Sequence, residues 1–255
     1  MALFRKISKV REIPKISYSL RQLPVKNCPK RWELDSDRAV LLLHDYQEFF
    51  FRFLSNDLRK EIIESTNLVI DWAIKHQVPT VLSGQAGYRE RLERGILRDL
   101  WGLGMSNEAN DTDFVKGLRT IPNFHKILKQ RYSAFASTNL ENIMRADRRD
   151  QMVICGVYGA VGITATAFDC VNKDIQSFIV PDAMVDFSAE THENTVNFLC
   201  DYSSDIVYSR YFLQGGGSNY SELICGRSFG TNMGEENIRK NSLFNEDRGC
   251  KSQCS

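Results

Sequence analysis

Short apolar runs alternate with amphipathic stretches along most of the chain, and this alternation limits the possible folds more than any other feature. The run at 39–44 is apolar up to its final histidine, as expected for a parallel strand that is buried on both faces. Over 58–76, apolar residues recur at helical spacing and form one stripe. The pattern then predicts strands at 78–83, 124–128, 151–156, 175–180 and 205–208, and helices at 138–146, 162–171 and 189–200.

Strands that alternate with helices predict a parallel sheet with right-handed crossovers. We therefore expect an α/β protein with a three-layer, Rossmann-like fold, in which helices cover both faces of a six-stranded parallel sheet over 38–213. Residues 1–37 contain Pro14, Pro24 and Pro29, and we expect them to form an extended N-terminal arm packed on this domain. Residues 214–255 are rich in glycine and poor in large apolar side chains, so we expect a flexible tail.

Charge and composition exclude several classes of protein. The 33 lysines and arginines balance 32 aspartates and glutamates, so we expect no binding of nucleic acid through bulk positive charge. No apolar run approaches the ~20 residues that span a bilayer, and the first ten residues do not resemble a secretory signal. We therefore expect a soluble, cytoplasmic protein that binds no membrane. In that compartment the seven cysteines are expected to be free thiols, and neither their spacing nor that of the four histidines predicts a metal site.

Polar or glycine-rich sequences follow four of the predicted strands. In an open parallel sheet, ligands bind beyond the carboxyl ends of the strands, where the strand order reverses. Asp45 follows the first strand, Gln85 the second and Lys129 the third, whereas a glycine-rich turn leads from the fourth strand to Gly162 at the start of a helix. These groups should therefore share one crevice. We expect His44, at the end of the first strand, to be structural rather than catalytic.

The strand ends belong to an ordered set of motifs that resembles the isochorismatase-type hydrolases from about residue 16 to residue 208. The motifs are RAVLLLHDYQ at 38–47, RGILRDLWGLGM at 94–105, KQRYSAF at 129–135, RDQMVICGVY at 149–158, DIQSFIVPDA at 174–183 and DFS at 186–188. Amidase members of this superfamily use a cysteine nucleophile at the position of Gly162. The chain is similar instead to the branch that cleaves vinyl ethers and lacks this cysteine.

The resemblance implies roles for eight residues and implies no cofactor or metal. The predicted catalytic residues are Asp45, Lys129 and Gln85. The predicted substrate-binding residues are Arg94, Tyr158, Gly162, Phe49 and Trp101. Asp45 would be the general acid, because burial raises the pKa of a carboxyl group towards neutrality. Lys129 would oppose this rise until a carboxylate of the substrate neutralises its charge.

The implied reaction is hydrolysis of an ether bond, the enolpyruvyl vinyl ether of isochorismate, which gives pyruvate and 2,3-dihydro-2,3-dihydroxybenzoate for siderophore biosynthesis. An alternative substrate is the 2-amino-2-deoxyisochorismate of phenazine biosynthesis. A further alternative is a non-catalytic family member that acts as a binding or oligomer partner. Ala86, Gln130 and Ala160 replace residues that are common in the relatives, so the choice of substrate stays open. By analogy with the family we expect a homodimer.

Overall fold

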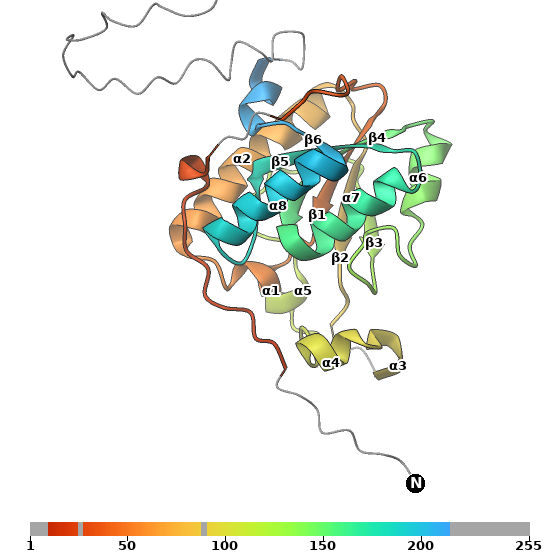
Figure 1. The fold of residues 1–255 in the computed structure, drawn as a ribbon. Coiled ribbons are helices and arrows are strands. Elements are labelled where there is room, and N and C mark those ends of the chain that lie inside the picture. The colour runs from red at the N-terminus through yellow and green to blue at the C-terminus, as the bar shows by residue number, and fades with distance from the viewer. Residues whose placement is uncertain (1–9, 25–27, 88–90, 215–255) are drawn as a thin grey trace, which may run out of the picture. The chain divides into compact units, whose positions relative to one another are not determined.

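The structure is a computed structural model that describes residues 10–24, 28–87 and 91–214. In this part of the chain six parallel strands form one sheet in the order β3-β2-β1-β4-β5-β6 (Figure 1). The strands are β1 (Ala39–His44), β2 (Thr80–Gly84), β3 (His125–Leu128), β4 (Gln151–Val157), β5 (Gln176–Val185) and β6 (Ser204–Ile206). The longer helices are α2 (Asn56–Lys75), α6 (Leu140–Ala146), α7 (Thr164–Val171) and α8 (Ala189–Tyr202). The predicted Rossmann-like α/β fold is confirmed.

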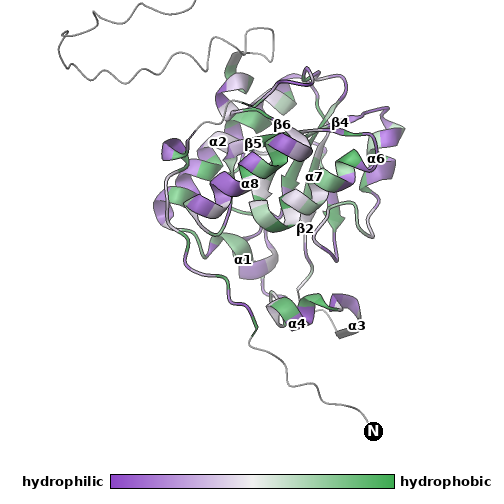
Figure 2. Ribbon diagram, viewed as in Figure 1, coloured by the Kyte–Doolittle hydropathy of each residue, from purple (hydrophilic) through white to green (hydrophobic). Residues whose placement is uncertain are grey.

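Helices cover both faces of the sheet. On one face, residues of α6, α7 and α8 pack with alternate residues of β1, Val40 and Leu42, in one buried apolar cluster. Helix α2 lies on the opposite face (Figure 1). It begins after Ser55, whose side chain accepts a hydrogen bond from the Leu58 amide. Figure 2 shows hydrophobic and hydrophilic residues alternating along α2 and α8, as expected for helices with one face on a core.

The sequence pattern does not predict the shorter elements. These are the helices α1 (Glu48–Phe51), α3 (Arg91–Arg94), α4 (Leu97–Trp101) and α5 (Ala109–Thr112), and the 3₁₀ turns η1 (Leu20–Gln22) and η3 (Ser209–Gln214). Such elements are too short to show a helical stripe in the sequence. A π-helical turn, η2 (Gly159–Ile163), precedes α7, so the regular helix begins two residues later than predicted. Strand β5 continues through Pro181 and ends five residues beyond its predicted end at 180.

The strand order reverses at β1, which pairs with β2 on one side and with β4 on the other. The carboxyl ends of β1 and β4 therefore flank the crevice in which ligands of such folds bind. Gly156 of β4 allows the two strands to lie this close, because its φ is +134° and a Cβ atom would lie 2.1 Å from the carbonyl oxygen of His44.

The N-terminal segment contacts the rest of the domain at several points. Ile16 is buried, its amide donates a hydrogen bond to the Phe53 carbonyl, and its carbonyl accepts one from the Ser55 amide. A disulfide joins Cys28 to Cys200 of α8. The prediction of free thiols is therefore wrong for these two cysteines, because a separation of 172 residues gives no sign in the sequence that they meet.

Two further cysteines, Cys155 and Cys170, are free and buried. The other three cysteines lie outside the described residues, as does the predicted tail apart from Gln214. The boundaries of the arm and of the tail stay predictions.

Candidate active site

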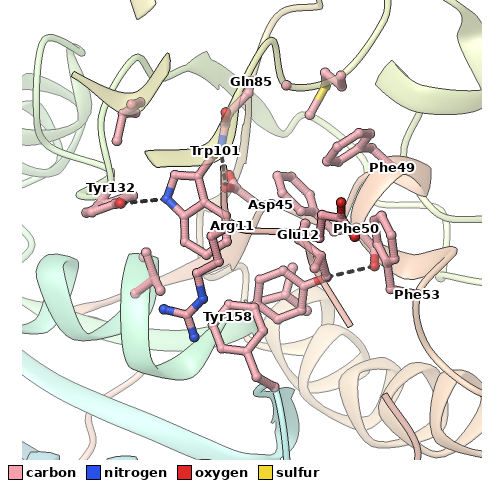
Figure 3. A pocket seen from close by; sticks show the side chains of 18 of the residues that line it. Arg11, Glu12, Asp45, Phe49, Phe50, Phe53, Gln85, Trp101, Tyr132 and Tyr158 are labelled. Atoms are coloured by element: carbon pink, nitrogen blue, oxygen red, sulfur yellow. Dashed lines mark hydrogen bonds between the residues drawn. The ribbon is translucent and has the colours of Figure 1, made fainter. Parts of the chain in front are cut away.

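A cavity of about 370 Å³ opens at the carboxyl ends of β1 to β4, beside the reversal of strand order (Figure 3). All eight predicted site residues line it, although they come from six separate parts of the sequence. They are Asp45, Phe49, Gln85, Arg94, Trp101, Lys129, Tyr158 and Gly162. The structure thus brings the predicted residues together, and their chemical roles follow from the contacts that each one makes.

Asp45 directly follows β1, and its side chain lies at the inner end of the cavity, only 3% exposed. Its φ is +55°, a left-handed conformation that Asp and Asn adopt more readily than most residues. Ser83 Oγ donates to its Oδ1 at 3.0 Å, and Gln85 Nε2 donates to its Oδ2 at 3.3 Å. Lys129 Nζ lies 2.8 Å from the same Oδ2. Donors from the ends of β2 and β3 therefore hold the carboxylate.

Two opposing effects determine the pKa of Asp45. Burial raises it. The charge of Lys129, the charge that His44 takes up only in acid, and the hydrogen bonds from Lys129 and Gln85 lower it, and the net pKa lies below its ordinary value. Before substrate binds, Asp45 is therefore ionised at neutral pH. This agrees with the expectation that Lys129 opposes the effect of burial, because Lys129 is itself buried and contacts the carboxylate directly.

Gln47 fixes the position of Gln85. Its Oε1 accepts a hydrogen bond from the Gln85 amide at 2.7 Å, and its Nε2 donates one to the Gln85 carbonyl at 2.9 Å. Gln47 is buried, so these two bonds set the backbone from which the Gln85 side chain reaches Asp45. In the sequence Gln47 is the last residue of the motif at 38–47, but nothing there indicates that it holds Gln85.

The imidazole of His44 fills the space that a side chain at position 162 would need. A Cβ atom on Gly162 would lie 2.3 Å from Cε1 of His44, far inside van der Waals contact. The ring is fully buried, and its Nδ1 lies 3.0 Å from the Val157 carbonyl oxygen. Burial lowers the pKa of His44 to about 4, so the ring is neutral at pH 7. The ring therefore leaves no space for a side chain at position 162, where the resemblance places the nucleophile of the amidase members. That His44 is structural rather than catalytic stays a prediction.

Arg94 lies in the cavity wall and is largely buried. Its Nε donates a hydrogen bond to the Gly102 carbonyl. Gly104 has a φ of +82°, and a Cβ atom there would lie 2.5 Å from Nη1 of Arg94. Glycine at 104 therefore allows the buried guanidinium to occupy its place.

Aromatic rings supply most of the apolar wall (Figure 3). The ring of Trp101 stacks on that of Phe187 with 6.0 Å between centroids, and its Nε1 donates to the Tyr132 hydroxyl at 2.7 Å. Phe49 packs edge to face on Phe53, with 5.9 Å between centroids. These contacts hold the rings in place around a flat or cyclic ligand.

Tyr158 lines the cavity, but its hydroxyl has a partner in the backbone. The hydroxyl donates a hydrogen bond to the Phe50 carbonyl at 3.0 Å, and the ring packs on Phe187 with 4.6 Å between centroids. Burial raises the pKa of Tyr158, so the hydroxyl keeps its proton. The resemblance assigns this hydroxyl to a substrate carboxylate, and in the structure it would first have to leave Phe50.

Residues 10–13, which the sequence does not mark as part of the site, line the mouth of the cavity. This segment precedes the first motif of the family resemblance, so the sequence carries no signal of its contact with the site. Figure 3 shows Arg11 and Glu12 among the lining side chains. Tyr132 and Phe187 lie within or next to the family motifs, but aromatic residues at such positions are as often part of a core.

Comparisons with known proteins identify the family of the chain. The isochorismatase domain model matches residues 39–207. A probable isochorismatase of Pseudomonas chlororaphis is 39% identical over 187 residues, which are 73% of this chain and 89% of that protein. The phenazine biosynthesis protein PhzD of Pseudomonas fluorescens is 39% identical over 162 residues, or 64% of this chain and 78% of that protein. Enterobactin synthase component B of Escherichia coli K12 is 29% identical over 184 residues, which are 71% of this chain and 65% of that protein.

Among solved structures, a cysteine hydrolase from Pseudomonas syringae pv. phaseolicola matches with a TM-score of 0.67 and 17% identity, covering 73% of this chain and 95% of that one. This likeness concerns the fold alone. The fold and the matched sequence together define a hydrolase of isochorismatase type with a Rossmann-like fold. The chain belongs to the isochorismatase family. Within the described residues, no cluster of His, Cys, Asp and Glu side chains is suited to hold a metal ion, and no helix has the length and apolarity needed to cross a membrane.

Proposed function

We propose that this protein hydrolyses the enolpyruvyl vinyl ether of isochorismate and releases pyruvate and 2,3-dihydro-2,3-dihydroxybenzoate. The observation that carries the proposal is a buried carboxyl group, Asp45, in a cavity where His44 leaves no room for a nucleophile at position 162. A carboxyl group without a neighbouring nucleophile suits acid catalysis rather than acyl transfer. The similarity to a probable isochorismatase supports the same reaction.

In the proposed reaction, the Asp45 carboxyl gives its proton to the terminal methylene carbon of the enolpyruvyl group. The electron pair of the C=C bond forms the new C–H bond and leaves an oxocarbenium ion. Water adds to the cationic carbon and returns one proton to the Asp45 carboxylate. The resulting hemiketal then breaks its C–O bond to the ring, so that the ring oxygen takes up the hydroxyl proton and pyruvate is released.

The proton on Asp45 has to arrive with the substrate, because Lys129 keeps this carboxyl ionised beforehand. A substrate carboxylate that approaches Lys129 would offset its positive charge. Burial, the largest effect on Asp45, would then raise the pKa of the acid with less opposition. We therefore propose that substrate binding and protonation of Asp45 are coupled. Arg94 would meet the substrate as a second cation, and Gln85 would orient the reacting end.

A coupled assay of pyruvate release tests the reaction. Asp45→Asn is the sharper variant, because Asn also tolerates the left-handed backbone at this position whereas Ala does not. We expect Asp45→Asn to lower kcat by roughly 10²- to 10⁴-fold, the usual contribution of a general acid. Asp57→Asn, at an exposed carboxylate in the first turn of α2, is the matched control and should leave the rate unchanged. Turnover by Asp45→Asn at the parent rate would exclude the mechanism.

Calorimetry tests the coupling separately from turnover. Binding of a dicarboxylate analogue at pH 7, measured in buffers with different ionisation enthalpies, reports the number of protons taken up. We expect net uptake by the parent protein and none by Asp45→Asn. Equal uptake by both proteins would show that another group accepts the proton.

A second candidate substrate is 2-amino-2-deoxyisochorismate. It is favoured by 39% identity to a phenazine biosynthesis protein, compared with 29% identity to an enterobactin synthase component. Parallel assays with both substrates decide between them, and release of pyruvate from neither would favour the non-catalytic alternative.

The proposal also includes a homodimer, which light scattering of the purified protein tests. A cytoplasmic location is part of the proposal too, although a reducing compartment disfavours a bond such as that between Cys28 and Cys200. Alkylation of free thiols in intact cells, before lysis, would show whether Cys28 and Cys200 are bonded or reduced there.

A further inference from the structure

Arg11 lies at the mouth of the cavity and outside the part of the chain that matches the family, which begins at residue 39. Its amide donates a hydrogen bond to the Leu100 carbonyl at 3.0 Å, so the backbone of the N-terminal segment is fixed to α4 at this point. The side chain is exposed, and Figure 3 shows it beside Trp101. Its position is thus defined by contacts although it lies near solvent.

Two aromatic rings of the cavity wall hold the guanidinium. Its central carbon lies 5.3 Å from the centroid of Trp101 and 5.2 Å from that of Phe187, within the range of cation–π attraction. Ring contacts of this kind hold the group through its charge and leave its N–H donors available for an anion. The arrangement therefore presents a positioned, planar donor to whatever occupies the mouth.

The chemistry at Asp45 determines which end of the substrate reaches this mouth. The proposed substrate carries two carboxylates, one beside the reacting vinyl group and one on the ring. In the proposed reaction Asp45 reaches the vinyl carbon, so the enolpyruvyl carboxylate would lie near Lys129, which contacts Asp45. The ring carboxylate would then point towards the mouth, where Arg11 offers the fork-shaped geometry that carboxylates prefer.

We infer that Arg11 is a specificity-determining residue that binds the ring carboxylate of the substrate. The inference rests on the proposed function for the identity of this substrate. Glu12, the next residue, also lines the cavity, and its negative charge opposes an anion at the same place. The N-terminal segment therefore contributes one attractive and one repulsive group to the choice of substrate.

Binding of three stable aromatic acids, measured by calorimetry at low ionic strength, tests the inference without any turnover. The dianion 3-(carboxymethoxy)benzoate carries both carboxylates, 3-methoxybenzoate carries only the ring carboxylate, and phenoxyacetate carries only the other. We expect Arg11→Gln to raise the Kd of the two benzoates about three- to fivefold, as for an exposed ion pair, and to leave phenoxyacetate unchanged. The effect should shrink at high salt, because exposed charges are screened.

Two further variants serve as matched controls. Glu12→Gln should tighten the binding of both benzoates, the opposite direction to Arg11→Gln. Arg21→Gln removes a charge from the same N-terminal segment, at an exposed ion pair with Glu64, and should change none of the three affinities.

Equal weakening of all three ligands by Arg11→Gln would show a merely structural role and overturn the inference. No change in any of them, or no binding of the benzoates to the parent protein, would overturn it as well. These outcomes are independent of the proposed reaction. If pyruvate is not released but Arg11→Gln selectively weakens the benzoates, the reaction is wrong and the binding role of Arg11 stands.

Discussion

Replacement of Gly162 by alanine should have opposite effects on stability depending on the residue at position 44. In the parent protein the new Cβ atom would lie 2.3 Å from Cε1 of His44 and 3.0 Å from its Nε2. Carbon atoms in contact are separated by roughly 3.5 Å, so the ring or the backbone has to move by about 1 Å. The ring is fully buried and close to the Val157 carbonyl, so this movement disturbs packed neighbours.

The magnitude follows from two competing terms. Overpacking of this kind costs about 1–3 kcal/mol. Against this, Gly162 lies in a helical turn and its φ is outside the left-handed region, so alanine there restricts the unfolded chain and should stabilise the fold by about 0.4–1 kcal/mol once space is available. With His44 in place, Gly162→Ala should therefore lower the free energy of unfolding. In a His44→Ala background, Gly162→Ala should raise the free energy of unfolding.

Urea unfolding of the parent, both single variants and the double variant measures this coupling. We expect an interaction energy of about 2 kcal/mol between the two positions, with His44→Ala alone destabilising because it leaves a cavity. If Gly162→Ala has the same effect in both backgrounds, the imidazole does not close this position. The steric argument against a nucleophile would then fail.

Three further predictions concern other groups. Burial lowers the pKa of His192 to about 4, so at pH 5 this histidine is protonated in the unfolded chain but not in the folded protein. The free energy of unfolding of the parent therefore falls between pH 7 and pH 5, and in His192→Gln it should fall by about 2 kcal/mol less. Cys28→Ser, which removes the bond to Cys200, should lower the free energy of unfolding by about 3 kcal/mol without reductant. Lys129→Met should raise the pKa of Asp45 above its ordinary value, as followed by the ¹³C shift of its carboxyl carbon, because burial then dominates.

Each of these measurements has its own control. For the first, the matched control is His125→Gln, which replaces an exposed histidine. A reductant should abolish the difference between the parent and Cys28→Ser. Were that difference to persist under reduction, the loss would come from packing at residue 28 rather than from the bond. An Asp45 pKa that stays low in Lys129→Met would mean that other donors, rather than the ammonium, hold the carboxylate ionised.

The sequence predicted features that depend on repeated local patterns. The bounds of β1 agree with the continuous apolar run at 39–44, and α2 agrees with its stripe to within two residues at its N-terminus. Asp45, Gln85 and Lys129 were predicted to share one crevice because each follows a strand and parallel strands end at the same edge of the sheet, and all three line the cavity. Helices of four or five residues, such as α4, carry too little pattern to be recognised.

Features that depend on contacts between distant residues were not predictable. The bond between Cys28 and Cys200 joins segments at opposite ends of the domain sequence. Likewise, the pKa of Asp45 depends on a contact of 2.8 Å with Lys129. The sequence does not give this distance, so it cannot show whether the effect of burial or that of the lysine charge on the pKa is larger. The place of Arg11 at the cavity mouth depends in the same way on how the N-terminal segment packs.

The close approach of β4 to β1 at Gly156 makes the width of the crevice a fixed dimension of the scaffold. Any side chain there would press on the main chain of His44, which leads directly into Asp45, and would wedge the two strand ends apart. A variant of this protein selected for a differently substituted ring could not easily spread the backbone to make room. Adaptation to a new ring should therefore occur through exchange of wall residues such as Phe49 or Trp101, while the spacing that places the acid stays constant.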